Sequence, residues 1–513
     1  MDSAPIMSDN LDMQVNYSAA TGPFGLQRRE FLKLAAIGGL AAGSGLVLPR
    51  RLMATQPDRE RVEVDLYMAP ATAQLKAGAP TPVWKYTGRV RKGSPSVLEN
   101  IPGSYLGPTF RVRRGTTVIV HMHNQLPEAT ITHWHGLDIP ARMDGHPIYA
   151  VPPGASFTYK FVVDQRAGTY WYHPHPDMRT GTQAYMGLAG LFIVEDDDEQ
   201  ALALPRGGYD VPIVIQDRSF NADNTLDYEP NMVDGLLGSD IFVNGIAGFS
   251  FSAATRFYRL RLLNGCNSRI LKLAFSDGTP MTVIGTDGGL IAAPRTYPYI
   301  TLSPGERCEV WADFRKPLGS TFTLDSQTFT GAGSLQGQFK SIMSFTVNRS
   351  EPEPLALPTQ LAPYERYQLA NVANPTTPRT FPIAWAASGG FTINGQAYGL
   401  NSVLANERVP ADTLELVKLT STTSGGPRVA HPMHFHGRQF QILDRTCQPA
   451  WQGGWNSVKD GFCDDGWKDT FTIMPGEEVR LLVKWSRHRG RFLYHCHNLP
   501  HEDTGMMRNY DVV

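Results

Sequence analysis

Residues 495–506, close to the carboxyl end of the chain, read His495-Cys496-His497-Asn498-Leu499-Pro500-His501-Glu502-Asp503-Thr504-Gly505-Met506. Cys, His and Met side chains at these spacings can meet on one metal ion, and a thiolate with imidazoles and a weak axial thioether suits a blue electron-transfer copper. Neighbouring residues of a β-strand point to opposite faces. If this stretch is a strand, the two flanking histidines face away from that metal. The segment therefore predicts two metal centres joined by a covalent bridge.

Three further histidine clusters occur in the chain. Two are His-x-His pairs at 133–135 and 173–175, and the third is His431-Pro432-Met433-His434-Phe435-His436. A single His-x-His pair is usually two ordinary strand or surface histidines, but four clusters with the Cys, His and Met spacing favour a metal site. Because the clusters lie toward both ends of the chain, we expect the site to be shared between domains that are distant in sequence.

The ligand types can be divided between two centres. One mononuclear site takes Cys496, His431, His501 and Met506. The other eight histidines of the clusters are too many for one ion and suit a cluster of three, two ions with three imidazoles each and a third with two. Imidazole in such numbers, beside a Cys–His–Met site, favours copper throughout.

Length and composition predict a β-rich protein of about three domains. The chain has 513 residues with 49 Gly and 38 Pro, which suits many short strands joined by turns. Three stretches, 107–123, 240–264 and 391–419, each combine a short motif, a turn and an alternating strand pattern, and a Pro-Gly turn follows each. We expect an all-β fold of tandem sandwiches, with domains at 56–200, 201–350 and 366–513 and a Pro-rich linker at 351–365.

The four metal-binding motifs resemble those of the multicopper oxidases, which include bacterial laccases, spore-coat laccase, bilirubin oxidase and the copper-efflux oxidase. Similar phrases at 186–191 and 466–469 extend the likeness over nearly the whole chain after the amino-terminal segment. The resemblance implies three tandem cupredoxin-like Greek-key β-sandwich domains. It places the type 1 copper in domain 3 and a three-copper cluster between domains 1 and 3.

The resemblance also implies a role for each ligand among four copper ions. Type 1 copper would be bound by His431, Cys496, His501 and axial Met506, and type 2 copper by His133 and His434. The type 3 pair would take His135, His173 and His497 on one ion, and His175, His436 and His495 on the other.

The implied reaction oxidises phenols or aromatic amines one electron at a time at the type 1 site and reduces dioxygen to water at the cluster. Protons for this reduction would come from Asp144, eleven residues after the first cluster histidine, and Glu502, six residues after the Cys. A solvated or structural acid is the alternative for each. The reducing substrate is expected to be a small molecule.

Two positions near the type 1 site bear on the substrate. The copper-efflux oxidases carry Asp and Met four and two residues before the type 1 His, where this chain has Pro427 and Val429, and no Met occurs between Met343 and Met433. A laccase-like oxidase is therefore favoured over a cuprous-ion oxidase. Alternatives are a metal-ion (cuprous or manganese) or bilirubin oxidase, an exported copper-binding protein without turnover, and a cell-division structural protein. Structural relatives of the last kind lack most ligands, whereas this chain keeps twelve.

The amino-terminal segment predicts export. Gln27-Arg28-Arg29-Glu30-Phe31-Leu32-Lys33 precedes a Gly/Ala-rich apolar stretch, 34–48, and resembles a twin-arginine signal, with signal and spacer at 1–55. A membrane anchor or amphipathic surface helix is the alternative, but the stretch is short for a stable membrane span. We expect a periplasmic or otherwise exported protein, a partner of the twin-arginine machinery and a monomer. The net charge of -1 gives no reason to expect a nucleic-acid partner.

The remaining cysteines and histidines have simpler expectations. In an oxidising compartment Cys447 and Cys463 predict one disulfide, and Cys266 and Cys308 a second, the alternative being four buried free thiols. The His-x-His pair at 121–123 is interpreted as ordinary strand residues. Two lone histidines, at 146 and 488, are expected in a loop and at the surface.

Overall fold

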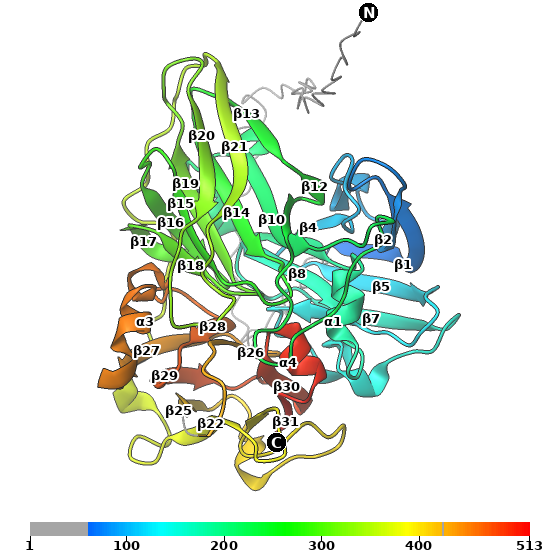
Figure 1. Ribbon diagram of the computed structural model, residues 1–513, viewed down its shortest axis with the longest axis vertical. Coiled ribbons are helices and arrows are strands. Elements are labelled where there is room, and N and C mark those ends of the chain that lie inside the picture. Colours follow the sequence, from blue (N-terminus) through cyan, green and yellow to red (C-terminus); the bar gives the residue numbers. More distant parts are fainter. Residues whose placement is uncertain (1–59, 423–424) are drawn as a thin grey trace, which may run out of the picture. The chain divides into compact units, whose positions relative to one another are not determined.

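The structure is a computed structural model that describes residues 60–422 and 425–513 (Figure 1). The predicted export signal and spacer, residues 1–55, lie outside the described residues. In the described part, the strands form six sheets that pair into three sandwiches, one after another along the chain. This confirms the predicted all-β fold of tandem cupredoxin-like sandwiches. The sandwiches span residues 61–195, 210–349 and 379–512; the domain limits and the linker at 351–365 stay predictions.

The first sandwich pairs the sheet β2-β1-β5-β7 with the sheet β3-β4-β9-β8-β6. Its strands are β1 Arg61–Ala73, β2 Thr81–Lys92, β3 Leu98–Glu99, β4 Thr109–Arg113, β5 Thr117–Asn124, β6 Thr132–His135, β7 Ser156–Val162, β8 Gly168–Pro174 and β9 Gly190–Glu195. The second pairs β12-β11-β10-β14-β19-β16-β17 with β13-β21-β20-β15-β18. Its strands are β10 Asp210–Arg218, β11 Asp240–Val243, β12 Ile246–Ala247, β13 Ser250–Ala254, β14 Phe257–Asn264, β15 Leu271–Phe275, β16 Met281–Thr286, β17 Gly289–Tyr297, β18 Ile300–Leu302, β19 Arg307–Asp313, β20 Thr321–Ser326 and β21 Lys340–Arg349.

The third sandwich pairs β23-β22-β25-β29-β27 with β24-β31-β30-β26-β28. Its strands are β22 Arg379–Trp385, β23 Phe391–Ile393, β24 Arg408–Val409, β25 Leu414–Ser421, β26 His431–Phe435, β27 Phe440–Cys447, β28 Thr470–Ile473, β29 Glu477–Lys484, β30 Gly490–Cys496 and β31 Met507–Val512. Short helices occur in the connections: α1 Thr180–Tyr185, α2 Asp197–Gln200, α3 Gln452–Asn456 and α4 Leu499–Asp503.

Alternation of apolar and polar residues explains how each sheet acquires a core face. On β5 the side chains of Val118, Val120 and Met122 are buried, while the intervening His121 and His123 are partly exposed. Each sandwich encloses its own hydrophobic core between its two sheets. The first and third sandwiches share two parallel strand pairings. These are β1 with β5 and β4 with β9 in the first sandwich, and β22 with β25 and β24 with β31 in the third.

This repeat places the histidine motifs on equivalent strands. β6 and β8 of the first sandwich correspond in sheet order to β26 and β30 of the third, and these four strands carry the clusters. In the paired registers His133 lies opposite His173, and His434 lies opposite His495. The corresponding strands of the second sandwich, β15 and β20, contain no histidine. The histidine clusters therefore come from the first and third repeats.

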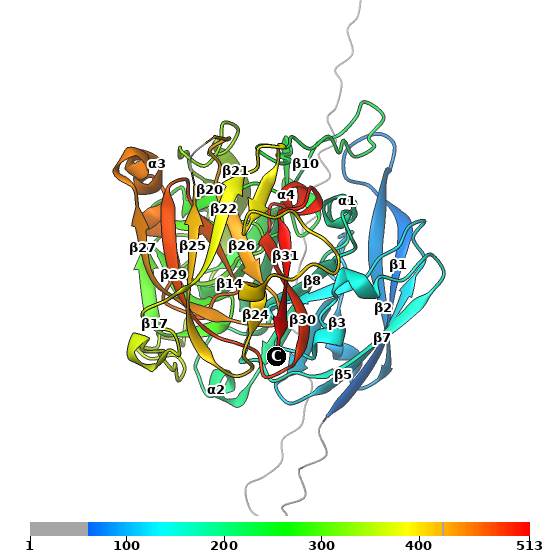
Figure 2. The same ribbon diagram turned by 90° about the horizontal axis from the view of Figure 1, so that it is seen from below.

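Two short helices join those repeats. α1 and α4 lie side by side in both views (Figures 1 and 2). The carboxylate of Asp503 at the end of α4 accepts hydrogen bonds from the main-chain N–H groups of Thr180 and Gly181, at 2.8 and 2.9 Å. Because α4 follows β30 directly, this contact holds the Cys496 segment against the first sandwich. No helix among the described residues has the length and apolar character needed to cross a membrane.

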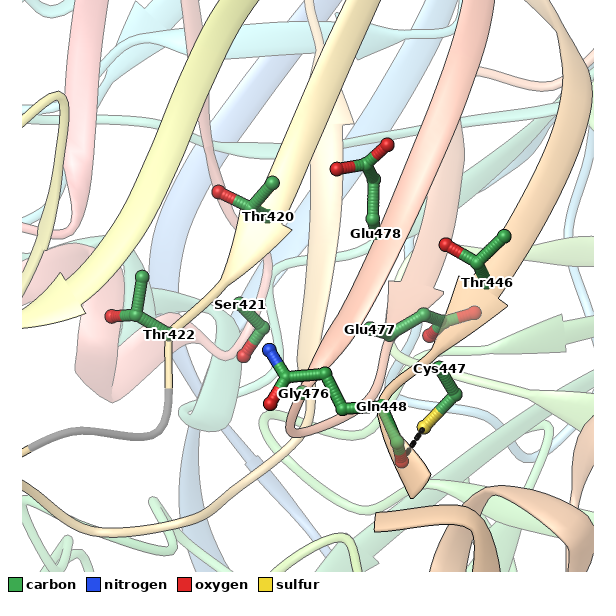
Figure 3. A pocket seen from close by; sticks show the side chains of 9 residues that line it. All are labelled: Thr420, Ser421, Thr422, Thr446, Cys447, Gln448, Gly476, Glu477 and Glu478. Atoms are coloured by element: carbon green, nitrogen blue, oxygen red, sulfur yellow. Dashed lines mark hydrogen bonds between the residues drawn. The ribbon is translucent and has the colours of Figure 1, made fainter. Parts of the chain in front are cut away.

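The predicted disulfides are wrong. All five cysteines of the chain are free thiols in the structure. Cys463 lies with its Sγ 3.9 Å from that of Cys308, and Cys447 instead borders a surface pocket of about 480 Å³ (Figure 3). The sequence distance between cysteines misled the prediction, because the segment after α3 leaves its own sandwich and packs on the second one.

Candidate metal centre

Eight histidines from the first and third sandwiches converge in the interior of the protein, and we call them the histidine cluster. They are His133, His135, His173, His175, His434, His436, His495 and His497, all at most 1% exposed. Strand alternation explains the local pattern, since His133 and His135 share one face of β6, and His495 and His497 flank Cys496. The predicted grouping of distant motifs is thus found in the structure.

Within the cluster, two triads match the expected type 3 sets. Ligand atoms of His135, His173 and His497 all lie within 4.8 Å of one another, and so do those of His175, His436 and His495. Neither ring nitrogen of His497 has a hydrogen-bond partner among the described residues. Buried polar atoms are nearly always paired. These free ring nitrogens therefore fit metal ligands.

The two residues predicted for type 2 copper face each other. The Nδ1 of His133 lies 2.6 Å from the main-chain oxygen of Asp144, and the Nδ1 of His434 lies 2.8 Å from that of Asp469. A carbonyl only accepts, so each Nδ1 carries the proton and each Nε2 presents a lone pair. The two Nε2 atoms are 3.4 Å apart. Two facing lone pairs in a buried site suit a shared cation.

Burial keeps these rings free of positive charge. Desolvation lowers the pKa of His173 to about 3 and takes the pKa of His133, His434 and His497 well below the ordinary value. Neighbouring imidazoles lower these pKa values further. At neutral pH these four rings are neutral, which is the form that binds a metal.

A second group of ligands lies on the opposite side of the Cys496 backbone. The Sγ of Cys496 is 3.6 Å from the Nδ1 of His431 and 3.7 Å from the Nδ1 of His501. Met506 is fully buried, and its main-chain N–H donates to the carbonyl of His501 at 2.9 Å. The ring of Phe391 packs on both imidazoles, with centroids 4.6 and 4.7 Å away. The structure thus brings together the side chains of His431, Cys496 and His501, and the main chain of Met506 is hydrogen-bonded to two of these residues.

Both predicted proton-supplying acids contact the cluster. The Oδ2 of Asp144 is 2.7 Å from the Nδ1 of His436, and burial raises the pKa of this carboxyl well above its usual value. The Oε2 of Glu502 is 3.0 Å from the Nδ1 of His495, and its Oε1 is 3.4 Å from the Nε2 of His175. Neither acid is solvated, because Asp144 is 0% and Glu502 1% exposed.

Two charged residues that support the cluster, an aspartate and an arginine, were not predicted from the sequence. The Oδ1 of Asp469 is 3.0 Å from the Nε2 of His135, and the same carboxylate pairs with the guanidinium of Arg307 at 2.6 Å. The Nε of Arg307 also donates to the main-chain oxygen of Thr169 at 3.0 Å. One buried pair therefore ties all three sandwiches to the cluster. The motif at 466–469 contains Asp469, but nothing in it indicates a partner arginine from another sandwich.

The other histidines lie outside the centre. His121 and His123 lie on β5 with their Nε2 atoms 3.0 and 2.9 Å from the carboxylates of Glu63 and Asp65. His146 is buried between two partners, receiving the main-chain N–H of Ile148 and pairing with Asn509 at 2.8 Å. Hydrogen bonds thus occupy these rings.

Comparisons with known proteins agree with this geometry. Residues 85–199 and 362–513 match two family models described as multicopper oxidase. The multicopper oxidase mco of Staphylococcus haemolyticus is 31% identical over 436 residues, which cover 83% of this chain and 88% of the relative. The laccase of Bacillus subtilis is 28% identical, covering 91% and 98%.

Solved structures share the fold. The crystal structure of the McoA multicopper oxidase from Aquifex aeolicus has a TM-score of 0.76 at 31% identity and covers 89% of this chain and 96% of that chain. Strand order, ligand convergence and sequence likeness point the same way. The chain belongs to the multicopper oxidase family, and its multicopper oxidase and laccase relatives support a copper oxidoreductase.

Proposed function

We propose that the protein is a laccase-like oxidase, which couples one-electron oxidation of phenols or aromatic amines to four-electron reduction of dioxygen to water. The observation that carries this proposal is the convergence of eleven of the twelve predicted ligands into two adjacent groups that share the Cys496 segment, with the twelfth, Met506, buried next to them along the chain. Copper, when bound, supplies the one-electron redox chemistry. We assign four ions, to the type 1 group of His431, Cys496, His501 and Met506 and to the histidine cluster.

The peptide around Cys496 connects the two groups. Cys496 faces His431 and His501, while His495 and His497 on either side face the cluster. The covalent route from sulfur through the main chain to an imidazole is on the order of 10 Å, given strand dimensions. β26 and α4 hold both ends of this segment, which keeps the route rigid.

Two carboxyl groups are placed to handle protons. Reduction of dioxygen to water needs protons inside a site that excludes water. Asp144, whose pKa is raised by burial, lies with its Oδ2 2.7 Å from the Nδ1 of His436 and is placed to exchange a proton there. Glu502 lies against His495 and His175 and can pass a proton toward the space between them.

The surroundings of the type 1 group favour an organic donor. A small crevice of about 10 Å³ lies at His431 and is lined by Trp385, Phe391, Arg428 and neighbouring residues. Among the described residues that line it, none is Met, Asp or Glu. Aromatic rings can stack on a phenol, whereas a cuprous ion is a soft ion that prefers thioether or thiolate ligands. His501 is covered, because its Nε2 bonds to the main-chain oxygen of Val233 at 3.0 Å.

A metal-ion or bilirubin oxidase is the second candidate, because outer-sphere electron transfer at a covered imidazole demands little of the donor's shape. A copper-binding or cell-division role without turnover is disfavoured by the complete ligand set and by the two acids touching it. The arginine pair at 28–29 supports a further proposal, export to the periplasm by the twin-arginine route.

Oxygen uptake by the copper-loaded protein tests the proposal. We expect a blue protein that consumes oxygen with dimethoxyphenol and with an aromatic diamine, faster than with Cu(I), Mn(II) or bilirubin. Uptake with the metal ions alone would favour the second candidate. A blue protein that consumes no oxygen with any donor would overturn the enzymatic assignment.

A further inference from the structure

Two buried thiols from different sandwiches meet outside the metal centre. Cys308 lies on β19 of the second sandwich, and Cys463 follows the 3-10 helix η8, Lys459–Gly461, of the third. Their Sγ atoms are 3.9 Å apart, and the two residues are 0% and 5% exposed. Both belong to the hydrophobic core of the second sandwich. Neither has a place in the proposed oxidase chemistry.

Contacts on both sides of Cys463 hold its segment in place. Before it, the hydroxyl of Thr301 donates to the main-chain oxygen of Val458 at 2.8 Å. After it, Asp465 accepts from the hydroxyl of Tyr297 at 3.0 Å and pairs with Arg295 at 2.8 Å. The approach of the two sulfurs is therefore set by the docking of the sandwiches.

The segment that contains Cys463 approaches the second sandwich so closely that little space remains between the two backbones. A Cβ at Gly461 would come within 2.5 Å of the ring of Tyr299. The segment thus lies directly on the second sandwich, and only small side chains fit beneath it. The sulfurs must approach by about 2 Å to reach the length of an S–S bond. Side-chain rotation, with no separation of the sandwiches, supplies movements of this size.

We propose that Cys308 and Cys463 form a disulfide that links the second sandwich to the third when the protein meets an oxidising thiol–disulfide environment. The co-reactant is an exchange-active disulfide such as oxidised glutathione. The thiolate of Cys463, the more exposed of the two, attacks one sulfur of the incoming disulfide and releases the first thiol. Cys308 then attacks the mixed disulfide and releases the second. The two cysteines lose two electrons and two protons, which leave on the two released thiols.

The cross-link would stabilise the arrangement that the metal centre needs. The segment continues from Cys463 through Lys468, which pairs with Glu306 at 2.8 Å, to Asp469 beside His135. Cys308 and Cys463 are 155 positions apart, and closing so long a loop restricts the unfolded chain strongly. We expect the melting temperature to rise by about 5 °C or more.

Mass spectrometry of the copper-loaded full chain tests the cross-link. The protein is held in reduced or oxidised glutathione at a temperature just below its transition, unfolded in acid, alkylated and digested without reductant. We expect a peptide joining Cys308 to Cys463 in the oxidised sample, with alkylation of both falling at least tenfold. Cys266 should stay alkylated, and Cys447 should be found alkylated or as a mixed disulfide with glutathione, not joined to another cysteine of the chain. Full alkylation of Cys308 and Cys463 under oxidation, or a Cys447–Cys463 peptide, would overturn the proposal.

Thermal melting gives a second readout that does not depend on oxidase activity. The oxidised wild type should melt above the reduced one, and Cys308→Ala and Cys463→Ala should each abolish that difference. Cys266→Ala is the matched control, because Cys266 is also buried but its Sγ lies against the main-chain oxygen of Ile215 and not against another thiol. Loss of the difference in Cys266→Ala, or its survival in both other variants, would contradict the proposed pair.

Discussion

The Nε2 atoms of His133 and His434 lie 3.4 Å apart although 301 residues separate them. One ring comes from the first sandwich and the other from the third. Each is oriented by a main-chain carbonyl bound to its Nδ1. The cluster is thus an interface between two domains, so metal binding and domain docking should depend on each other.

Replacing one of these rings should remove one ion. His434→Ala is expected to lower the copper content from about four to about three ions per chain while the blue absorption of the type 1 group stays. Metal analysis and absorption spectra check this. His488→Ala serves as the control, because its half-buried ring lies outside the centre. An unchanged copper content in His434→Ala would show that His434 is not a ligand.

Cys496→Ser tests the bridge between the two groups. Removing the sulfur should abolish the intense blue absorption and lower oxygen uptake with phenols more than about 100-fold. The histidine cluster keeps its eight rings, so it should still bind copper, measured by metal analysis. If the blue absorption persisted, the type 1 assignment would be wrong.

Glu502 is expected to act on oxygen reduction and not on donor oxidation. Glu502→Gln keeps the size of the side chain but cannot carry a carboxyl proton, and should slow reoxidation of the reduced enzyme by about 100-fold or more. Stopped-flow absorption separates this step from reduction by the donor. Glu502→Asp, which retains a carboxyl group, should recover part of the rate. Equal slowing of both steps in Glu502→Gln would count against a role in proton supply.

Asp469→Asn should weaken the joint between the sandwiches. The carboxylate is fully buried and pairs with Arg307, so its loss leaves a buried charge with only Asp287 nearby, at 3.6 Å. We expect the free energy of unfolding to fall by about 3 kcal/mol. Denaturant titration measures it, with Asp197→Asn, a change at an exposed acid, as the control. A loss no larger than that of the control would contradict this role.

Asp65 is expected to make the stability of the folded protein depend on pH, and the sign of this dependence follows from the residues that bond to its carboxylate. Although burial opposes ionisation, hydrogen bonds from Arg91, Arg89 and His123 lower the pKa of this carboxyl. Its contribution to stability is therefore present above pH of about 4, the ordinary value for Asp, and is lost as the pH falls below it. Both arginines are largely exposed, so Asp65→Asn should cost only about 1 kcal/mol at pH 7.

Thermal melts of Asp65→Asn and the wild type across this pH range check that sign. The two melting temperatures should differ at pH 7 and draw together as the pH falls below about 4. A gap that widens toward low pH would mean that the native carboxyl is not held ionised by its partners.

Several features of the site follow from local geometry and were accessible from the sequence. Alternation along a strand puts His133 and His135 on one face and turns His495 and His497 away from Cys496. Cys496 ends a strand, His501 lies in the short helix that follows, and Met506 comes three residues after that helix. These residues therefore stay close together wherever the segment docks. The roles of Asp144 and Glu502 came only from the resemblance, and their contacts became visible in the fold.

Contacts between sandwiches could not be predicted from local sequence patterns. The pairing of Arg307 with Asp469 and the approach of Cys308 to Cys463 join positions far apart, and neither is marked by a periodic pattern. The two wrong disulfide predictions show that distance along the sequence does not reveal which cysteines meet. Nearness in sequence suggested Cys447 as the partner of Cys463, whereas the segment that contains Cys463 packs on another sandwich.

The all-β class, the family and the kinds of ligand could be predicted from the amino-acid sequence, because strand alternation and motif spacing act over a few residues. Which histidines face each other, which acids touch them and which thiols meet depends on the folded arrangement of the three sandwiches. Those distances are set by the packing of three separate cores against one another. No short stretch of sequence encodes that packing alone.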